Sequence, residues 1–255
     1  HEKAARESGA LWNGLISDQV ALTKMFKQHA NGPLIKMLDI LQEGGIQAFD
    51  PIAHQYLPSK LYSLGTSERK ATLLQLPSPT HQEAIHRATV IEEFKGFLRE
   101  CDHDRYVKTH LLINLQDRTS WREHARCAAL EDLQHLDEFD PLCVVTLAKD
   151  TEFYHQLAPY AQNHHADVFI QHFKDHLQDS SAGFYFPVSI ANQLFPRFVD
   201  GVMATIHRVF FSNRNVLSRE HRLDFIEIFY LFLQLKLIEI CKADSFSLTC
   251  KDGVD

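Results

Sequence analysis

The sequence predicts a helix-rich α+β protein, with a helical region over residues 1–104 and a small sheet flanked by helices over residues 105–255. Apolar residues recur at helical spacing through the first region. In the second region, short runs of apolar and β-branched residues end in polar turns that lead into helical patterns. Hydrophobic residues make up 45% and charged residues 23% of the 255 residues, the composition of a globular chain with a substantial core.

The first region is expected to consist of helices interrupted by glycine and proline. Residues 1–42 follow a helical pattern that breaks at Asn31-Gly32-Pro33. Residues 49–64 carry two prolines, which favour an irregular stretch with a short helix. Two more helices are expected over residues 66–76 and 81–99. The inner face of the last helix would hold Ile85, Val90, Ile91, Phe94 and Leu98.

Two units of strand, turn and helix open the second region. Strands are expected over residues 107–115 and 142–147, and helices over residues 121–136 and 152–158. This alternation predicts strands joined by crossover helices, with the connecting loops gathered at the carboxyl ends of the strands. Residues 184–187 are expected to be an extended connection or a short edge strand, because their proline cannot donate to a strand ladder.

The remaining chain is expected to form long helices and one final strand. The three helices cover residues 164–177, 191–211 and 220–241. The second of them has an irregular start at Pro196, and Ser218 is the expected N-cap of the third. Residues 245–249 alternate in polarity and are expected to be a central strand of the sheet.

Cys250 opens a polar loop, Cys-Lys-Asp-Gly-Val-Asp, directly after this strand. In cysteine phosphatases a thiolate attacks phosphorus while N–H groups of the following loop hold the phosphate oxygens. Lys251 would neutralise phosphate charge, and Gly253 would let the backbone fold closely around an anion. A Cys-x5-Arg loop also needs an arginine directly after Asp255, so we expect this region to be incomplete at its C-terminus.

The stretch resembles the Cys-Lys-Ser-Gly-Lys-Asp-Arg-Thr signature of the inositol polyphosphate 4-phosphatases and the bacterial secreted inositol phosphate phosphatases. Its matching positions are Cys250 for the nucleophile, Lys251, Gly253 and Asp255. The two remaining positions carry Asp and Val in place of Ser and Lys. The resemblance implies a cysteine-phosphatase-like fold that acts on phosphoinositides or inositol phosphates. Catalysis is expected if an arginine follows Asp255, and phosphate binding by a degenerate relative if it does not.

Two polar turns of the second region supply candidate partners for Cys250. Asp117 and Arg118 follow the first expected strand, and Asp150 follows the second. Arg118 would bind an anion, and Asp117 or Asp150 would act as the general acid. The alternative for both turns is ordinary helix capping.

The histidines offer a metal-site alternative. His172 and His176 lie at i and i+4 beside Asp175, and His164-His165 comes two turns earlier. A chain with 16 histidines produces such spacings readily, and no third ligand is marked out. A solvated amphipathic helix is therefore favoured, and we expect no metal and no cofactor.

Charge and cysteine usage bound the partners and the compartment. A net charge of −7 without a block of basic residues argues against nucleic acid and against a polybasic membrane anchor. Five scattered cysteines without a CxxC pair fit free thiols in a reducing compartment, either the cytoplasm or, after secretion, a host cytosol. The most apolar segment, residues 225–241, contains Glu227, Lys236 and Glu239, which suits a buried helix and not a membrane span.

These observations favour a phosphatase-like domain that binds or acts on a phosphorylated small molecule or lipid headgroup. The alternative is a non-enzymatic helical interaction or scaffolding domain of a larger bacterial protein. That alternative predicts exposed apolar side chains and a Cys250→Ser variant that keeps every measurable property.

Overall fold

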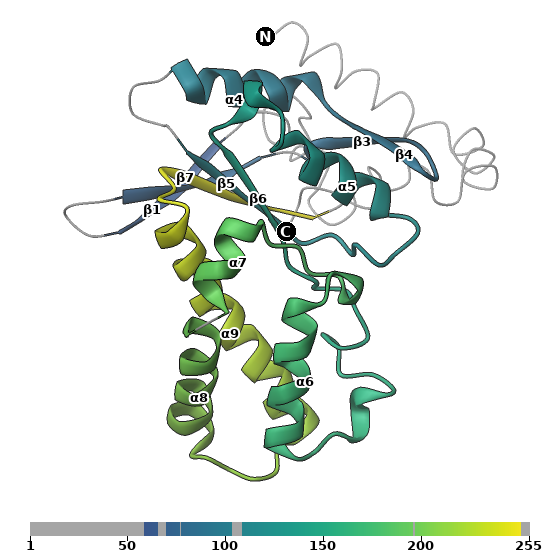
Figure 1. The fold of residues 1–255 in the computed structure, drawn as a ribbon, viewed down its shortest axis with the longest axis vertical. Helices are drawn as coiled ribbons and strands as arrows, with labels where there is room; N and C mark the ends of the chain where they lie inside the picture. The colour runs from purple at the N-terminus through teal and green to yellow at the C-terminus, as the bar shows by residue number, and fades with distance from the viewer. Residues whose placement is uncertain (1–58, 66–69, 77, 104–108, 196, 251–255) are drawn as a thin grey trace, which may run out of the picture. The chain divides into compact units, whose positions relative to one another are not determined.

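The computed structural model describes residues 59–65, 70–76, 78–103, 109–195 and 197–250, all of which lie in one unit spanning residues 58–255. The central sheet is built from β1 Ser59–Gly65, β2 Lys70–Gln75, β5 His110–Asn114, β6 Leu142–Thr146 and β7 Ser245–Thr249. The strand order is β1-β2-β7-β5-β6 (Figure 1). β1 pairs with β2 antiparallel, and the other three pairings are parallel. The prediction that residues 245–249 form a central strand is confirmed.

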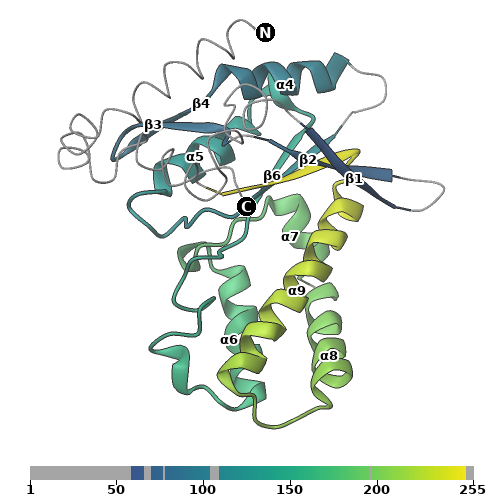
Figure 2. The same ribbon diagram turned by 180° about the vertical axis from the view of Figure 1, so that it is seen from behind.

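Helices cover both faces of this sheet. One face carries α4 Glu92–His103 and α5 His124–Leu133. The other carries α6 Ala166–Gln178, α7 Val188–Leu194, α8 Phe198–Phe211 and α9 Arg219–Ile240 (Figures 1 and 2). Short 3-10 turns lie at Asp137–Phe139, Tyr160–Gln162 and Ser180–Ala182, and a hairpin of β3 Thr80–Ala84 and β4 Arg87–Val90 contacts α5. The described residues thus form a mixed fold of helices around a small sheet, as predicted.

Alternation along the strands assigns each side chain to one of the two helical layers. In β5, Leu112 belongs to the core cluster of α4 and α5, whereas Leu111 and Ile113 belong to the cluster of α6–α9. All three have no exposed surface. Full burial of such side chains stabilises the fold by about 1.5–3 kcal/mol each. Because both faces are covered, β5 reads as a continuous apolar run in sequence.

The helices predicted over residues 66–76 and 81–99 are largely wrong. β2 replaces the first, and the β3–β4 hairpin replaces the start of the second, so that only α4 remains helical. In β2 alternate residues such as Ala71 and Leu73 are buried, and the distant strand β7 pairs with β2 at Thr72 and Leu73. Ile85, predicted on the inner face of a helix, lies in the turn between β3 and β4 and is 56% exposed. β1 occupies the end of the stretch predicted as irregular, and the predictions for residues 1–58 lie outside the described residues.

The predictions for the second region are mostly confirmed, with shifted element ends. β5, β6, α5, α6, α9 and β7 lie at the predicted positions. The hydroxyl of Ser218 accepts a hydrogen bond from the N–H of His221 at 3.2 Å and so caps α9. Two predictions need correction: residues 151–156 form turns instead of a helix, and the helix predicted over residues 191–211 is divided into α7 and α8.

A tight helix ending passes the chain from α9 into β7. Cys241 is the C-cap of α9, and Lys242 has a left-handed backbone with φ 51°. The N–H of Lys242 donates to the carbonyl of Glu239 at 3.1 Å, and the N–H of Ala243 donates to that of Ile238 at 3.0 Å. This pair of hydrogen bonds is a Schellman motif, which satisfies the last carbonyls of the helix. The chain therefore reverses sharply and enters the sheet two residues later.

His110 ties the register of β5 to that of β7. Its Nδ1 lies 2.9 Å from the hydroxyl of Ser245, and its Nε2 lies 3.0 Å from that of Ser247. The ring is fully buried beside the rings of Phe94 and Phe97 of α4. Burial lowers the pKa of His110 to about 3, so the imidazole is neutral, with one nitrogen donating and the other accepting.

The fold should lose stability as the pH falls below the ordinary histidine pKa of 6.5, because the unfolded state then binds a proton that folded His110 does not. The stabilisation is complete above pH 6.5 and declines towards pH 3 by roughly 1.4 kcal/mol per pH unit. Chemical denaturation gives the free energy of unfolding at pH 7.5 and at pH 5. Between these two pH values the wild type should lose about 2 kcal/mol more of this free energy than His110→Gln does. The exposed His86→Gln is the matched control and should behave as the wild type. Parallel profiles for all three proteins would contradict this account.

Candidate functional site

Three parallel strands end at the same level and form what we call the carboxyl edge. Asn114 at the end of β5 pairs with Thr146 at the end of β6 and with Thr249 at the end of β7. Pairing continues one residue further, since the N–H of Leu115 donates to the carbonyl of Thr249 and that of Leu147 to the carbonyl of Asn114, both at 2.8 Å. The loops that follow the three strands therefore begin side by side.

The carboxyl edge contains a topological switch point between β5 and β7. The chain passes from β5 to β6 through α5, and then returns past β5 to β7 through α6–α9 on the opposite face (Figure 1). Right-handed crossovers running in opposite directions place their helices on opposite faces. In open α/β sheets, such a switch point is where ligands commonly bind.

Cys250 is the first residue after β7 at this switch point. Its thiol is free and its side chain is half-buried. The hydroxyl of Thr249 donates to the carbonyl of Cys250 at 3.2 Å. Lys251 and Gly253, the predicted phosphate-binding residues of the loop, lie outside the described residues. The structure thus defines the position of the thiol relative to the sheet.

A buried polar network lies beneath the carboxyl edge on the α5 side. The amide of Asn114 donates to the hydroxyl of Thr146 at 3.2 Å and to the thiol of Cys127 at 3.3 Å. The hydroxyl of Thr146 donates to the carboxylate of Glu131 at 3.0 Å. The sequence analysis did not predict these polar side chains. Each lies within an apolar sequence pattern, and its hydrogen-bond partners belong to another strand or helix.

Arg118 is held by this network and is not aimed freely at a ligand. Its Nε lies 3.0 Å from both carboxylate oxygens of Glu131, and a terminal guanidinium nitrogen donates to the carbonyl of Ser180 at 3.0 Å. The guanidinium also lies 5.9 Å from the ring centre of Tyr185. Burial raises the pKa of the Glu131 carboxyl, and the charge of Arg118 opposes that rise. The predicted anion-binding arginine therefore already has a carboxylate partner.

The two candidate general acids, Asp117 and Asp150, lie in the turns after β5 and β6. The Asp117 carboxylate accepts hydrogen bonds from the N–H and the hydroxyl of Thr119, at 2.8 Å and 2.6 Å, as in an Asx turn. Asp150 is 78% exposed and pairs with His155 at 2.9 Å. Local turn bonding thus accounts for Asp117, whereas Asp150 remains open to solvent.

The turns after β5 and β6 meet at Gly183. A Cβ added to this glycine would lie 3.0 Å from the Cβ of Ala148, 3.4 Å from Thr119 and 3.6 Å from Thr151. Its φ of 98° is strained for any other residue. The two turns that carry the predicted acids are therefore brought together, with Gly183 fitting between them.

Gln116 carries an unsatisfied amide at the carboxyl edge. It lies two residues after β5 and is 1% exposed. Its backbone N–H donates to the side chain of Asn114 at 3.2 Å, but neither atom of its own amide has a partner among the described residues. A buried amide without partners costs free energy, so the arrangement favours a group that would satisfy it.

Comparison with protein-family models, curated proteins and solved structures finds no match. The function must therefore be inferred from the carboxyl edge itself.

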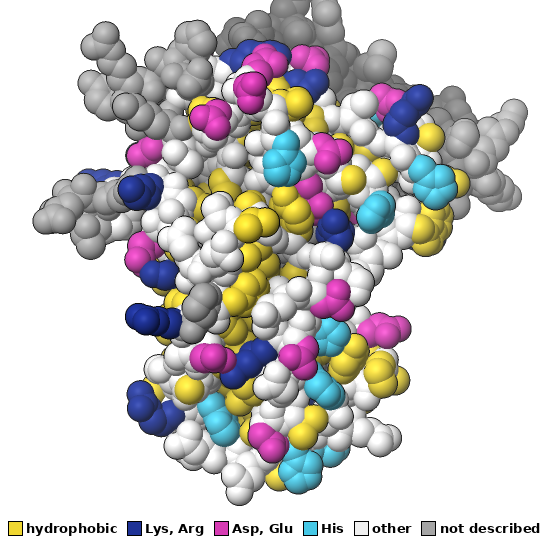
Figure 3. All heavy atoms as spheres, in the orientation of Figure 1, with side chains coloured by type: hydrophobic (Ala, Val, Ile, Leu, Met, Phe, Trp, Pro, Cys, Tyr) yellow, Lys and Arg dark blue, Asp and Glu magenta, His cyan; other side chains and the backbone are white. Residues whose placement is uncertain are grey.

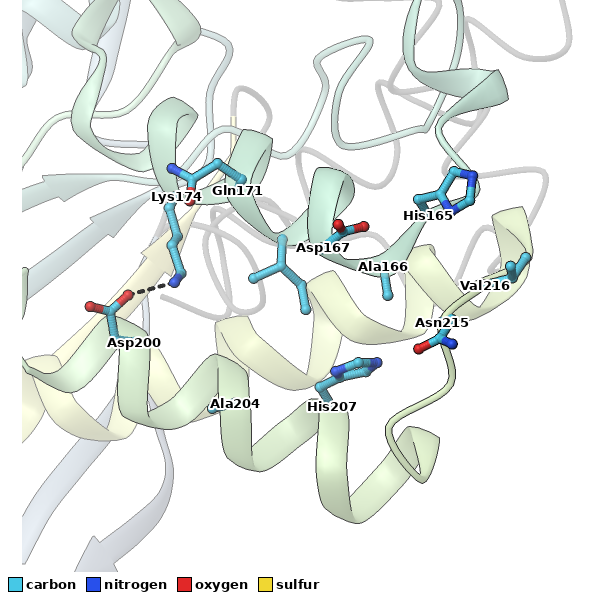
Figure 4. Close-up of a pocket in the computed structure, with 11 residues that line it drawn as sticks. His165, Ala166, Asp167, Gln171, Lys174, Asp200, Ala204, His207, Asn215 and Val216 are labelled. Carbon is cyan, nitrogen blue, oxygen red and sulfur yellow. Dashed lines mark ion pairs between the residues drawn. The ribbon is translucent and has the colours of Figure 1, made fainter.

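A groove of about 690 Å³ lies elsewhere, between α6, α8 and the turn after α8 (Figure 4). Lys174 and Asp200 form an ion pair at 2.6 Å at one end, and His165 and Asn215 lie towards the other. Among the described residues that line this groove, His165 belongs to the metal-site alternative, and none is a predicted phosphatase-site residue. Its lysine charge is already neutralised, so the groove offers less to an anion than its size suggests.

The described residues contain no group of three histidine, cysteine or acidic side chains arranged to hold a metal ion. The side-chain amide of Asn163, which precedes α6, donates to Nδ1 of His172 on α6 at 3.1 Å. His176 is half-buried, with its ring centre 4.4 Å from that of Phe153. These two histidines are thus engaged in packing and hydrogen bonding with neighbouring protein groups.

Removing the charge of Arg118 alone should lower the free energy of unfolding more than removing the charges of both Arg118 and Glu131. Arg118→Met leaves a buried carboxylate without its counter-charge and should destabilise the protein by about 3 kcal/mol. Adding Glu131→Gln removes that charge and keeps an acceptor for Thr146, so it should recover at least about 1 kcal/mol. Chemical denaturation of the two single variants and the double variant measures the coupling. Strictly additive effects would show that the pair is not energetically linked.

Proposed function

We propose that the carboxyl edge binds a phosphate ester, and that Cys250 is the nucleophile of a cysteine-dependent phosphatase acting on inositol phosphates or phosphoinositides. The observation that carries the proposal is the position of Cys250, directly after the central strand at a topological switch point. The polar, glycine-containing sequence that follows Cys250 indicates a phosphate group as the ligand.

The reaction would proceed in two steps. The Cys250 thiolate attacks phosphorus, the ester P–O bond breaks, and the leaving oxygen takes a proton from a general acid. Water then attacks the thiophosphate, the P–S bond breaks, and phosphate leaves with the thiolate restored. Between the two candidate acids, Asp150 is the better one, because its carboxyl is open to solvent, whereas that of Asp117 accepts two local hydrogen bonds from Thr119.

Positive charge for the phosphate would come from the cysteine loop itself. Among the described cations near this edge, Arg118 pairs with Glu131 and Lys149 lies 3.4 Å from Glu227. We therefore assign phosphate contacts to the loop N–H groups and to Lys251, with Arg118 as a brace beneath the site. Gln116 would complete the pocket by donating its unsatisfied amide to the ligand.

The face shown in Figure 3 fits a small phosphorylated ligand better than a nucleic acid. On the face shown in Figure 3, acidic and basic side chains are interspersed instead of gathering into a basic patch. The chain as a whole carries a net charge of −7. No helix among the described residues combines the length and apolarity needed to cross a bilayer.

The test is phosphate release from inositol polyphosphates by the full-length protein under reducing conditions. Cys250→Ser should lower the rate by about 10³-fold or more, because a serine hydroxyl is a far weaker nucleophile than a thiolate. Cys143→Ala, altered on β6 away from the carboxyl edge, should retain the activity. Equal rates for the wild type and Cys250→Ser would contradict the proposed nucleophile.

A second candidate is the helical interaction or scaffolding domain. It is supported by large apolar side chains that are exposed on α8 and α9, among them Val209, Phe210, Leu231 and Leu235, each more than half exposed. Isolated exposed apolar residues are common, whereas this set lies on two helices that pack together. The same assay separates the candidates, since an interaction domain would show no phosphate release that depends on Cys250.

A further inference from the structure

Two of the five cysteines are in direct contact. Cys143 is the second residue of β6, and Cys241 is the C-cap of α9. Their Sγ atoms are 3.3 Å apart, and both side chains are half-buried against the core of the α6–α9 layer. A disulfide bond has an S–S length of about 2.05 Å, so bond formation needs the sulfurs to approach by only about 1.2 Å.

The two thiols differ in acidity because they share a hydrogen bond. That bond lowers the pKa of Cys241, whereas the bond and burial together raise the pKa of Cys143. The thiolate is the reactive form of cysteine. We therefore assign Cys241 as the attacking thiol of a thiol–disulfide exchange.

We propose that Cys143 and Cys241 form a site of reversible thiol oxidation, which low-molecular-weight disulfides of the glutathione class convert into an intramolecular disulfide bond. The geometry carries this assignment, because the two sulfurs are already in contact while their positions are 98 residues apart in the sequence.

The proposed thiol–disulfide exchange with oxidised glutathione proceeds in two steps. The Cys241 thiolate attacks one sulfur of oxidised glutathione, the S–S bond breaks, and one glutathione thiolate leaves. Cys143 then loses its proton to solvent and attacks the Cys241 sulfur, which releases the second glutathione thiolate. Two cysteine thiols are oxidised and one glutathione disulfide is reduced to two thiols. An excess of reduced glutathione reverses both steps.

The disulfide would close the whole connection between β6 and β7. The segment between the two cysteines contains the four helices of the α6–α9 layer. A cross-link around so long a loop restricts the unfolded chain strongly. Oxidation would therefore fasten this helical layer to the sheet.

The other described cysteines are poorly suited to compete. Cys127 has no exposed surface, and burial raises the pKa of its thiol to about 12. Cys101 is also buried. Cys250 lies at the carboxyl edge, whereas Cys143 lies near the start of its strand. The proposal is thus independent of the proposed phosphatase chemistry.

The experiment equilibrates the full chain in glutathione buffers of graded redox potential, traps free thiols with an alkylating agent, and maps linked peptides by mass spectrometry. We expect one linked peptide pair, joining Cys143 to Cys241, and its loss on treatment with dithiothreitol. The oxidised protein should melt roughly 5 °C or more above the reduced protein.

Two single variants and one control make the test decisive. Cys143→Ala and Cys241→Ala should each lose the linked peptide and the redox-dependent melting shift, with a melting curve in the reduced state that shows they are folded. Cys250→Ser should keep both signals. Failure to form the Cys143–Cys241 link in the folded wild type, or a glutathione adduct on Cys241 that never resolves, would overturn the proposal.

Discussion

The structure depends on the insertion of β7 between β2 and β5. This strand is contributed from the far end of the chain, yet it pairs in parallel with both neighbours and makes the sheet continuous. His110 fixes its register through Ser245 and Ser247, and the Schellman ending of α9 delivers it at the correct place. Without β7, the strand pairs β1–β2 and β5–β6 would be separate. Each would then expose unpaired backbone N–H and C=O groups at an inner edge.

The same insertion creates the candidate site. Because the chain returns past β5 to reach the centre, the strand order reverses at β5 and β7, and Cys250 lies at this switch point of the carboxyl edge. Beneath that edge, Asn114, Thr146 and Glu131 form a buried network that also holds Arg118. A fully bonded network of this kind is rigid, and it fixes the strand ends relative to one another. The proposed function of Cys250 uses this rigid edge as its support.

The sequence predicted those parts of the fold that local patterns specify. The buried strands β5 and β6, the helices α6 and α9 and the position of Cys250 follow from apolar runs, caps and turns. β2 and the β3–β4 hairpin were missed, because their short apolar runs fit a helix equally well and only pairing across the fold makes them strands. Glu131 and Gln116 were missed for a related reason, since burial and partners come from tertiary structure.

The central claim is that the carboxyl edge is a phosphate site. Its most direct test is a titration of the isotope-labelled protein with inorganic phosphate and with vanadate, followed by the amide chemical shifts of the whole chain. The account predicts saturable shifts at the backbone amide of Cys250 and at the side-chain amide of Gln116, reduced in Cys250→Ser for vanadate. Shifts confined to the groove between α6 and α8, or no saturable shift at the carboxyl edge, would contradict it.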